Sequence, residues 1–374
     1  MIWVIGDIHG RLDPLVSLFN KLPAFYKKNT KLIFLGDYFD AGASSRAVLD
    51  TLIDWPGNKV FLAGDYEDLL LRFINKDDSF LEYYPRQWRP NPLADLYSSI
   101  FGQKEGQEFR QRFKAWPEAP DPRAEWEWLK SHAPTLPDKY LNFFQNLKYL
   151  HRETFELEDE EQVFTFCHGL PRPSQSLEGL VLDNFADFNA YLKTLSQQRA
   201  AASPNEPAGG SSENDLFPLE KTFLRGQEYD FTERYPVGVI VHGHFPTIGY
   251  PDFFPDFFAA TDKIKSQFSN FLQIPGLPFL FSNQAGAGYL LRDTKESGYF
   301  RPPYKTYTYE IPEGGSLAAI NVDSGLGSGG CLTAIGLPNF KDISDGIEFI
   351  SVKSNGNYRM NEVIEYGVLN IYNL

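Results

Sequence analysis

Five short apolar runs in this chain each lead into a residue that can bind a metal ion. The runs are short, contain β-branched side chains and end near glycine, which is typical of buried strands. They read IWVIGDIHG, KLIFLGDYFD, KVFLAGDYED, QVFTFCHGL and VGVIVHGHF. The polar residues at their ends are Asp7, His9, Asp37, Asp40, Asp65, His168, His242 and His244.

Acids and imidazoles at several strand ends predict a metal site. Ligands of open α/β sheets bind just beyond the carboxyl ends of the strands, so we expect these side chains at one edge of one sheet. Buried acids without cations are costly. Asp7 and His9 are two residues apart and are expected on the same face of a strand. Asp37, after the second run, is placed to bridge two ions. Carboxylate with imidazole favours Zn, Fe or Mn.

The first seventy residues alternate between strand and helix patterns. Apolar residues recur at helical spacing within 12–22, 48–53 and 67–75, after each of the first three runs. Strands that alternate with helices predict parallel βαβ units.

The rest of the chain is expected to remain part of a single domain spanning residues 1–374. Residues 76–150, rich in Trp, Tyr, Phe and Pro, interrupt the alternation and predict an inserted helical cap. This insertion either covers the core or selects the substrate. Residues 196–216 are small, polar and rich in Gly and Pro, which predicts a flexible loop. Strand patterns return from residue 317 onwards and are expected to form the second sheet of a sandwich.

Composition limits the possible partners and locations. The net charge of −14 gives no support to binding of a nucleic-acid backbone, which needs basic patches. No apolar run approaches the ~18 residues of a membrane span, and no targeting segment is visible. We therefore expect a cytoplasmic protein that does not bind a membrane. The two cysteines, Cys167 and Cys331, predict neither a thiolate metal site nor a disulfide framework.

The ordered set GDIHG, GDYFDAG, GDYED, HGL and GHFPT resembles the calcineurin-like metallophosphoesterases. The likeness is greatest to the bacterial phosphoprotein phosphatase type, which includes diadenosine tetraphosphatases. The segment INVDSGLGSGGCLTAIGL is similar to a further pattern of that family. The resemblance implies an α/β sandwich of two mixed β-sheets flanked by helices. It also implies a metal site at the carboxyl ends of the strands.

The resemblance further implies a hydrolase of phosphate esters that acts through a metal-activated hydroxide and two divalent ions (Mn, Fe or Zn). The substrate would be a phosphoprotein or a nucleotide. The ligands implied for the first ion are Asp7, His9 and Asp37, and those for the second are Asp37, Asp65, His168 and His244. Asp40 matches the acid that orients the catalytic histidine of the family, and Arg225 resembles an arginine that grips phosphate.

The chain departs from the family pattern at its catalytic centre. Asp65 replaces an asparagine ligand, Tyr66 the catalytic histidine, Ala41 a phosphate-binding arginine and Leu170 a glycine. A third carboxylate should tighten metal binding but make the site less attractive to a phosphate dianion. Tyrosine, with an ordinary pKa of about 10, is a poorer acid at pH 7 than histidine, at about 6.5. These changes predict weaker hydrolysis of phosphomonoesters.

Two questions stay open at this point. His242 lies two residues before His244 and is a substitute proton donor, a substitute ligand, or a buried histidine of the core or of the metal surroundings. The second question is the function of the chain. The first alternative is a phosphoesterase in which Asp40, Tyr66 or His242 assists the leaving group. Alternatively, it is a weak or inactive homologue that binds metal and a phosphorylated ligand as an interaction module.

Overall fold

The computed structural model describes most of the residues from the N-terminus to about 200 and the strands that follow. The described residues are 1–22, 30–40, 42–83, 92–101, 107–116, 119–157, 160–169, 180–202, 238–244, 279–282, 289–293, 305–310, 317–323, 326, 330–337, 347–353 and 363–372. Ala41, Leu170, Arg225 and residues 203–216 of the predicted loop lie outside the described residues, so the predictions for them are not addressed by the structure.

The N-terminal part forms the predicted βαβ units. In chain order its elements are β1 (Ile2–Ile5), α1 (Leu12–Lys21), β2 (Lys31–Phe34), α3 (Ser45–Asp54), β3 (Asn58–Phe61) and α4 (Asp65–Ile74). The three strands are parallel, and Ile5 lies opposite Phe34, which in turn lies opposite Phe61. The strands therefore end in step, and the loops that carry the first acids begin at the same edge.

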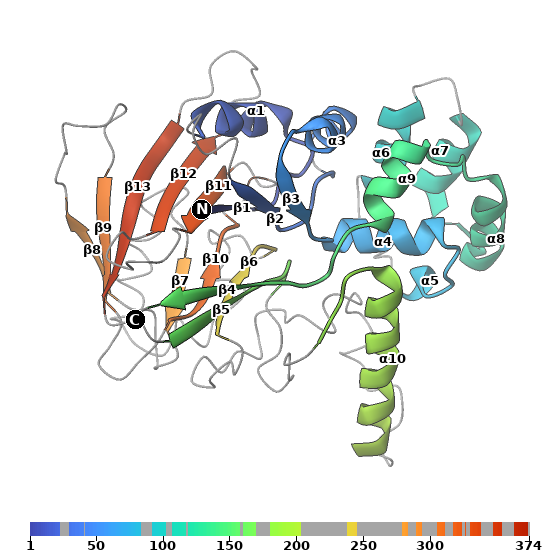
Figure 1. Cartoon of the computed structure of the whole chain (residues 1–374). Helices are drawn as coiled ribbons and strands as arrows, with labels where there is room; N and C mark the ends of the chain where they lie inside the picture. Colours follow the sequence, from blue (N-terminus) through green and yellow to red (C-terminus); the bar gives the residue numbers. More distant parts are fainter. Residues whose placement is uncertain are drawn as a thin grey trace.

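The larger sheet continues with strands from the C-terminal part of the chain. These strands are β8 (Tyr289–Asp293), β9 (Lys305–Glu310), β11 (Cys331–Leu337), β12 (Ile347–Lys353) and β13 (Val363–Tyr372). The order of the eight strands is β3-β2-β1-β11-β12-β13-β9-β8, and β11 pairs antiparallel with β1. Helix α1 packs on β11 and β12 (Figure 1).

The smaller sheet joins segments that are far apart in the sequence. Its strands are β4 (His151–Leu157), β5 (Glu160–Phe166), β6 (Val239–His242), β7 (Phe279–Ser282) and β10 (Leu317–Asn321). The order is β4-β5-β6-β10-β7, in which β5, β6 and β10 run parallel to one another. The prediction that the C-terminal strands form this second sheet was wrong, because only β10 belongs to it. β11 pairs with the edge of β1 that faces away from β2, and this pairing places β11 to β13 in the first sheet.

Two mixed sheets flanked by helices confirm the predicted fold class. The remaining helices are α5 (Phe80–Tyr83), α6 (Pro92–Phe101), α7 (Gln107–Ala115), α8 (Pro122–His132), α9 (Asp138–Gln145) and α10 (Phe185–Ala202). Figure 1 shows α4 to α9 gathered beside the sheets. None of the helices in the described part of the chain is long and apolar enough to cross a membrane.

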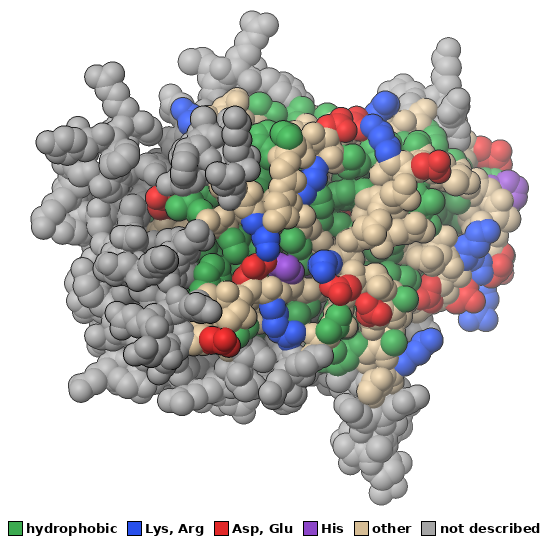
Figure 2. Space-filling view, viewed as in Figure 1, with side chains coloured by type: hydrophobic (Ala, Val, Ile, Leu, Met, Phe, Trp, Pro, Cys, Tyr) green, Lys and Arg blue, Asp and Glu red, His purple; other side chains and the backbone are tan. Residues whose placement is uncertain are grey.

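Aromatic side chains of the helical insertion pack on one another and on α4, as part of the hydrophobic core. Phe73, from α4, stacks on Phe113 with ring centroids 4.8 Å apart, and Phe80 stacks on Trp126 at 4.7 Å. Such pairs stabilise a core beyond the area that they bury. The helical character of residues 76–150 is as predicted in the part that the structure describes. Acidic and basic side chains are interspersed over these helices on the face that Figure 2 shows.

Candidate metal centre

The loops after β1 and β2 are bound to each other by backbone hydrogen bonds. The N–H groups of Ile8 and His9 both donate to the carbonyl oxygen of Asp37, at 3.0 and 2.7 Å, and Gly10 N–H donates to Tyr38 at 2.9 Å. Asp7 and His9 therefore lie in a turn beyond β1, which ends at Ile5. The expectation that they share one face of a strand was wrong, because the strand ends before both residues and His9 has a φ of 47°.

Several candidate residues have a backbone conformation that side chains rarely adopt. The φ angles of His9, Asp37, Asp40 and His244 are 47°, 49°, 123° and 67°. Outside glycine, the described chain has only one other residue with positive φ, Lys76. Strain of this kind costs on the order of 1–3 kcal/mol per residue and gathers at functional sites. The hydrogen-bonded loops therefore hold these residues in a backbone conformation that they would not prefer on their own.

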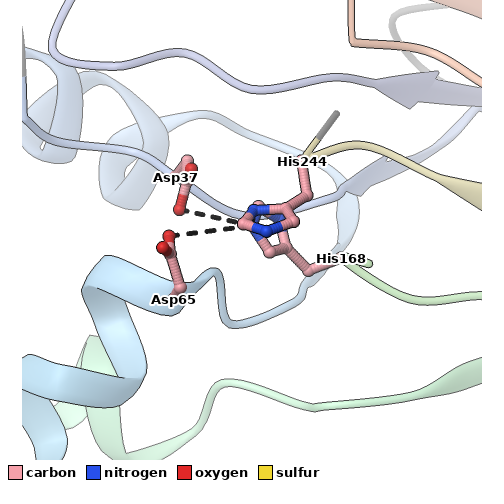
Figure 3. A group of neighbouring side chains, drawn as sticks. All are labelled: Asp37, Asp65, His168 and His244. Atoms are coloured by element: carbon pink, nitrogen blue, oxygen red, sulfur yellow. Dashed lines mark hydrogen bonds and ion pairs between the residues drawn. The ribbon is translucent and has the colours of Figure 1, made fainter. Parts of the chain in front are cut away.

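Asp37, Asp65, His168 and His244 form one group of possible metal ligands. One ligand atom from each lies within 4.8 Å of the corresponding atoms of the others. His168 Nε2 is 3.5 Å from Asp37 Oδ1 and 3.9 Å from Asp65 Oδ1 (Figure 3). His168 Nδ1 donates to the carbonyl oxygen of Leu35 at 2.9 Å, which leaves Nε2 as the nitrogen that can bind a metal ion. Nε2 lies 3.1 Å from His244 Nδ1, closer than either acid.

Asp7, His9 and Asp37 form a second group within the same 4.8 Å limit. His9 Nε2 is 3.8 Å from Asp37 Oδ2. Asp37 is the residue that the two groups have in common, and it presents one carboxylate oxygen toward each. This is the arrangement that a carboxylate bridge between two ions requires.

The candidate ligands come from strands of both sheets. Asp7, Asp37 and Asp65 follow β1, β2 and β3 of the larger sheet, whereas His168 and His244 follow β5 and β6 of the smaller one. The expectation of a single sheet edge was therefore wrong. Gly243 N–H donates to the carbonyl oxygen of His168 at 2.8 Å, and His244 N–H donates to Asp7 Oδ2 at 2.9 Å. The second of these bonds joins the two sheets at the site.

Two glycines allow the close approach of these loops. A Cβ atom at Gly64 would lie 2.1 Å from Asp37 Oδ1, and one at Gly243 would lie 2.2 Å from Asp7 Oδ1. Both distances are far below van der Waals contact. Any side chain at either position would therefore displace a candidate ligand.

Burial and mutual repulsion disfavour the ionised form of the acids at this site. Burial and the charges of Asp65 and Asp7 raise the pKa of Asp37 well above its usual value. Burial opposes protonation of His9, but the surrounding acids, chiefly Asp40 and Asp7, raise its pKa to about 9. Burial, together with His244, lowers the pKa of His168 well below its ordinary value. The centre thus attracts a cation and holds His168 neutral, as a ligand must be.

The buried polar atoms at the centre fit divalent metal ions. One oxygen each of Asp7, Asp37 and Asp65, and Nδ1 of His9, are buried without a hydrogen-bond partner. A buried carboxylate oxygen without a partner costs free energy that a cation would recover. The donor set of carboxylates and imidazoles suits Zn, Fe or Mn.

Asp40 and Tyr66 lie at the same centre. Asp40 Oδ2 is 3.6 Å from His9 Nδ1, and the Asp40 carboxylate is within hydrogen-bonding range of the Tyr66 hydroxyl. The ring of Tyr66 meets the ring of His9 edge to face, with centroids 6.1 Å apart. Burial, followed by the charges of Asp65 and Asp40, raises the pKa of Tyr66 far above its ordinary value. Tyr66 therefore stays a neutral phenol that can donate a hydrogen bond.

His242 differs from the other candidate residues. It is fully buried, and it belongs to neither group of possible ligands in the described part of the chain. Its Nδ1 lies 3.0 Å from the carbonyl oxygen of Gly243. Burial lowers its pKa to about 4, so it is neutral near pH 7. Among the three alternatives for His242, these observations favour a buried histidine over a proton donor or a ligand.

Glu67 is a residue that the sequence reasoning missed. This fully buried carboxylate accepts backbone N–H bonds from Asp37 at 2.8 Å, Gly64 at 2.9 Å and Tyr38 at 3.0 Å. Burial raises its pKa to about 7, although these three bonds favour the charged form. Glu67 thereby fixes the loop of Asp37 to the start of α4. The available signal was its position two residues after Asp65, in the first turn of a helix.

We expect Glu67→Gln to destabilise the protein although it preserves the size of the side chain. The amide has only one acceptor atom, so at least one of the three backbone donors loses its partner. A buried donor without a partner costs about 1–3 kcal/mol. Urea unfolding of the metal-free protein measures the loss. Glu127→Gln, at an exposed position paired with Lys130, is the control and should change stability by less than about 0.5 kcal/mol. Equal midpoints for both variants would contradict the role of Glu67.

Comparison with known proteins places the chain in a family. The sequence matches the calcineurin-like phosphoesterase family over residues 1–247, which is more than half of the chain. No curated protein matches it. The solved structures similar to it include a protein proposed to be a diadenosine tetraphosphatase, with 14% identity and a TM-score of 0.36, covering 95% of this chain and 94% of that one. Another is a cold-active protein tyrosine phosphatase of a psychrophilic Shewanella species, with 14% identity and a TM-score of 0.35, covering 97% and 80%. The match over residues 1–247 shows that the chain belongs to the calcineurin-like phosphoesterase family.

Proposed function

We propose that the protein is a phosphoesterase that depends on two divalent metal ions. The observation that carries this proposal is the position of Asp37, which presents one oxygen to each of two groups of buried ligands. A single structural ion would need only one such group. Asp7, His9 and Asp37 would hold one ion, and Asp37, Asp65, His168 and His244 the other. When bound, such ions polarise a phosphoryl oxygen and make water a nucleophile at neutral pH.

The residues around the ligands determine which leaving groups the site favours. Tyr66, a neutral phenol beside Asp40, would donate a hydrogen bond to the leaving oxygen without readily transferring its proton. General acid catalysis is worth about 10²–10⁴-fold, and this site has a poor acid. We therefore propose substrates with stable leaving groups, such as aryl phosphates in phosphoproteins or phosphoanhydrides in nucleotides. Arg225 would grip the phosphate of the substrate.

The second candidate function is a binding module with little activity. Asp65 adds a third carboxylate to those of Asp7 and Asp37 in the two ligand groups, and the high pKa of Tyr66 weakens it as an acid. Both features weaken catalysis and leave metal binding intact. Such a protein would bind metal and a phosphorylated ligand without turning it over.

Hydrolysis of a generic aryl phosphate separates the two functions. Purified full-length protein is stripped with chelator, loaded with Mn²⁺ and assayed on aryl and alkyl phosphates, while its metal content is measured. We expect two ions per chain and metal-dependent turnover of the aryl ester, with slower turnover of the alkyl ester. The chelated protein is the matched control.

The possible failures of this assay are distinguishable. Two bound ions without turnover of any ester would support the binding module. Protein that binds no metal after loading with Mn²⁺ or Zn²⁺ would overturn both functions. Equal rates on aryl and alkyl esters would contradict the preference for stable leaving groups.

A further inference from the structure

Three neighbouring strands of the smaller sheet share a pattern that includes an acid with no assigned role. Strands β5, β6 and β10 are parallel, and they end at Phe166, His242 and Asn321. The second residue beyond each end is His168, His244 and Asp323, respectively. Two of these three residues are candidate metal ligands. Because parallel strands end at the same edge of a sheet, the third belongs to the same region.

Contacts of the backbone place Asp323 beside the loop that carries Asp7. Val322 N–H donates to the carbonyl oxygen of His242 at 2.8 Å, so the chain continues along β6 past the end of the strand. A Cβ atom at Gly6 would lie 2.7 Å from Val322 O and 3.6 Å from Asp323 N. Asp323 N–H donates to Asn321 Oδ1 at 2.9 Å, which fixes this turn. Asp323 thus lies between the loop after β1 and the end of β6.

Asp323 is buried, with 4% of the residue exposed. Its backbone lies beside Gly6, the residue that precedes the candidate ligand Asp7. In the half of the centre formed by Asp7 and His9, Asp7 Oδ1 and His9 Nδ1 are buried without a hydrogen-bond partner. Asp7, Asp37 and Asp323 are all buried, and a neighbouring cation would offset the cost of burying their charges.

The two groups of ligands are unequal without Asp323. The group around His168 has four side chains, whereas the group of Asp7, His9 and Asp37 has three and shares one of them. Asp323 is a described residue but does not fall within the 4.8 Å limit of that group. Its position therefore suits an acid that neighbours the cation and its ligands rather than one that binds both ions.

We propose that Asp323 is an additional acidic residue of the Asp7–His9–Asp37 half of the centre, where it raises the affinity of that half for a divalent cation. This inference rests on the proposed two-ion function. Polar groups that support the ligands of a metal typically contribute about 10–100-fold to its affinity. The effect should be confined to one of the two ions, because His168 and His244 lie at the other half.

Titration of the metal-free full-length protein with Mn²⁺ tests the assignment, with calorimetry and electron paramagnetic resonance as readouts. Asp323→Asn should weaken one class of site by roughly 10-fold or more and leave the other unchanged. Asp323→Glu, which keeps the charge, should bind more tightly than Asp323→Asn at that site. The matched control is Asp13→Asn, another buried acid, which lies in the first turn of α1 and outside both ligand groups. It should bind both ions as the wild type does.

Thermal melting separates a role in metal binding from a structural one. The metal-free Asp323→Asn protein should melt at or above the temperature of the wild type, because a repulsive charge is removed, but gain less from added Mn²⁺. Unchanged affinity at both sites, or a lower melting temperature without metal, would overturn the assignment of Asp323. A wild-type protein that binds no Mn²⁺ would instead reject the proposed function. If the wild type binds two ions and the Asp323→Asn variant binds them equally well, only the assignment of Asp323 fails.

Discussion

Replacing Asp37 by asparagine should remove both metal ions and reduce hydrolysis to the level of the chelated protein. Asp37 is the residue common to the two ligand groups, and each of its oxygens faces a different group. An asparagine keeps the shape but offers one neutral oxygen and one NH₂ group, which repels a cation. Elemental analysis after Mn²⁺ loading, together with aryl phosphate turnover, measures the result.

Asp40→Asn is the control for the Asp37 variant. Asp40 lies beside His9 but outside both groups of described ligand atoms, so this variant should keep both ions. Its turnover should fall nonetheless, because the acid beside His9 and Tyr66 loses its charge. An Asp37→Asn protein that still holds two ions would contradict the bridge, and one that holds a single ion would restrict Asp37 to one half of the centre.

The paired change Asp65→Asn with Tyr66→His should increase hydrolysis of alkyl and phosphoseryl esters by roughly 10-fold or more, because general acid catalysis spans about 10²–10⁴. The change removes one negative charge from the group around Asp37 and replaces a phenol with a raised pKa by an imidazole. Asp40 already lies within hydrogen-bonding range of the side chain at position 66 and would orient the new histidine. Rates on aryl and alkyl phosphates are compared at saturating Mn²⁺.

Aryl phosphates should gain much less from the paired change, because their leaving groups are already stable as anions. Tyr66→Phe is the matched variant and should slow alkyl esters more than aryl esters if the hydroxyl assists departure. A paired variant with unchanged alkyl rates, beside a His242→Ala protein that is inactive but loaded with metal, would transfer the role of the acid to His242.

Much of the centre was predictable because most of its candidate ligands lie in short sequence motifs. A short apolar run followed by Gly-Asp, as before Asp7 and Asp37, or by Ala-Gly-Asp, as before Asp65, is visible in a short window, and neighbouring parallel strands bring their carboxyl ends to one edge. The alternation of strands and helices predicted the N-terminal βαβ units, whose strands and helices match the expected ranges. The ordered motifs predicted the family that the match over residues 1–247 shows.

Sheet membership and the supporting residues were not predictable in the same way. The patterns of β10 and β11 are both short apolar runs, yet β10 lies between β6 and β7 and β11 pairs with β1. Glu67 and Asp323 stand in or beside recognisable motifs, but only contacts with the backbone of Asp37 and with the loop of Asp7 place them at the centre. Nothing within a short window encodes such contacts.

The sequence by itself determined the residue types of the candidate centre, the strands that lead to them and the family. The tertiary structure decided that the centre draws its ligands from two sheets, that its loops adopt positive φ and that Glu67 and Asp323 lie beside it. The physical reason is the distance in sequence over which each interaction acts. Strand propensity and ligand chemistry act over a few neighbouring residues, whereas strand order and the burial of an acid depend on contacts between segments that are distant in the sequence.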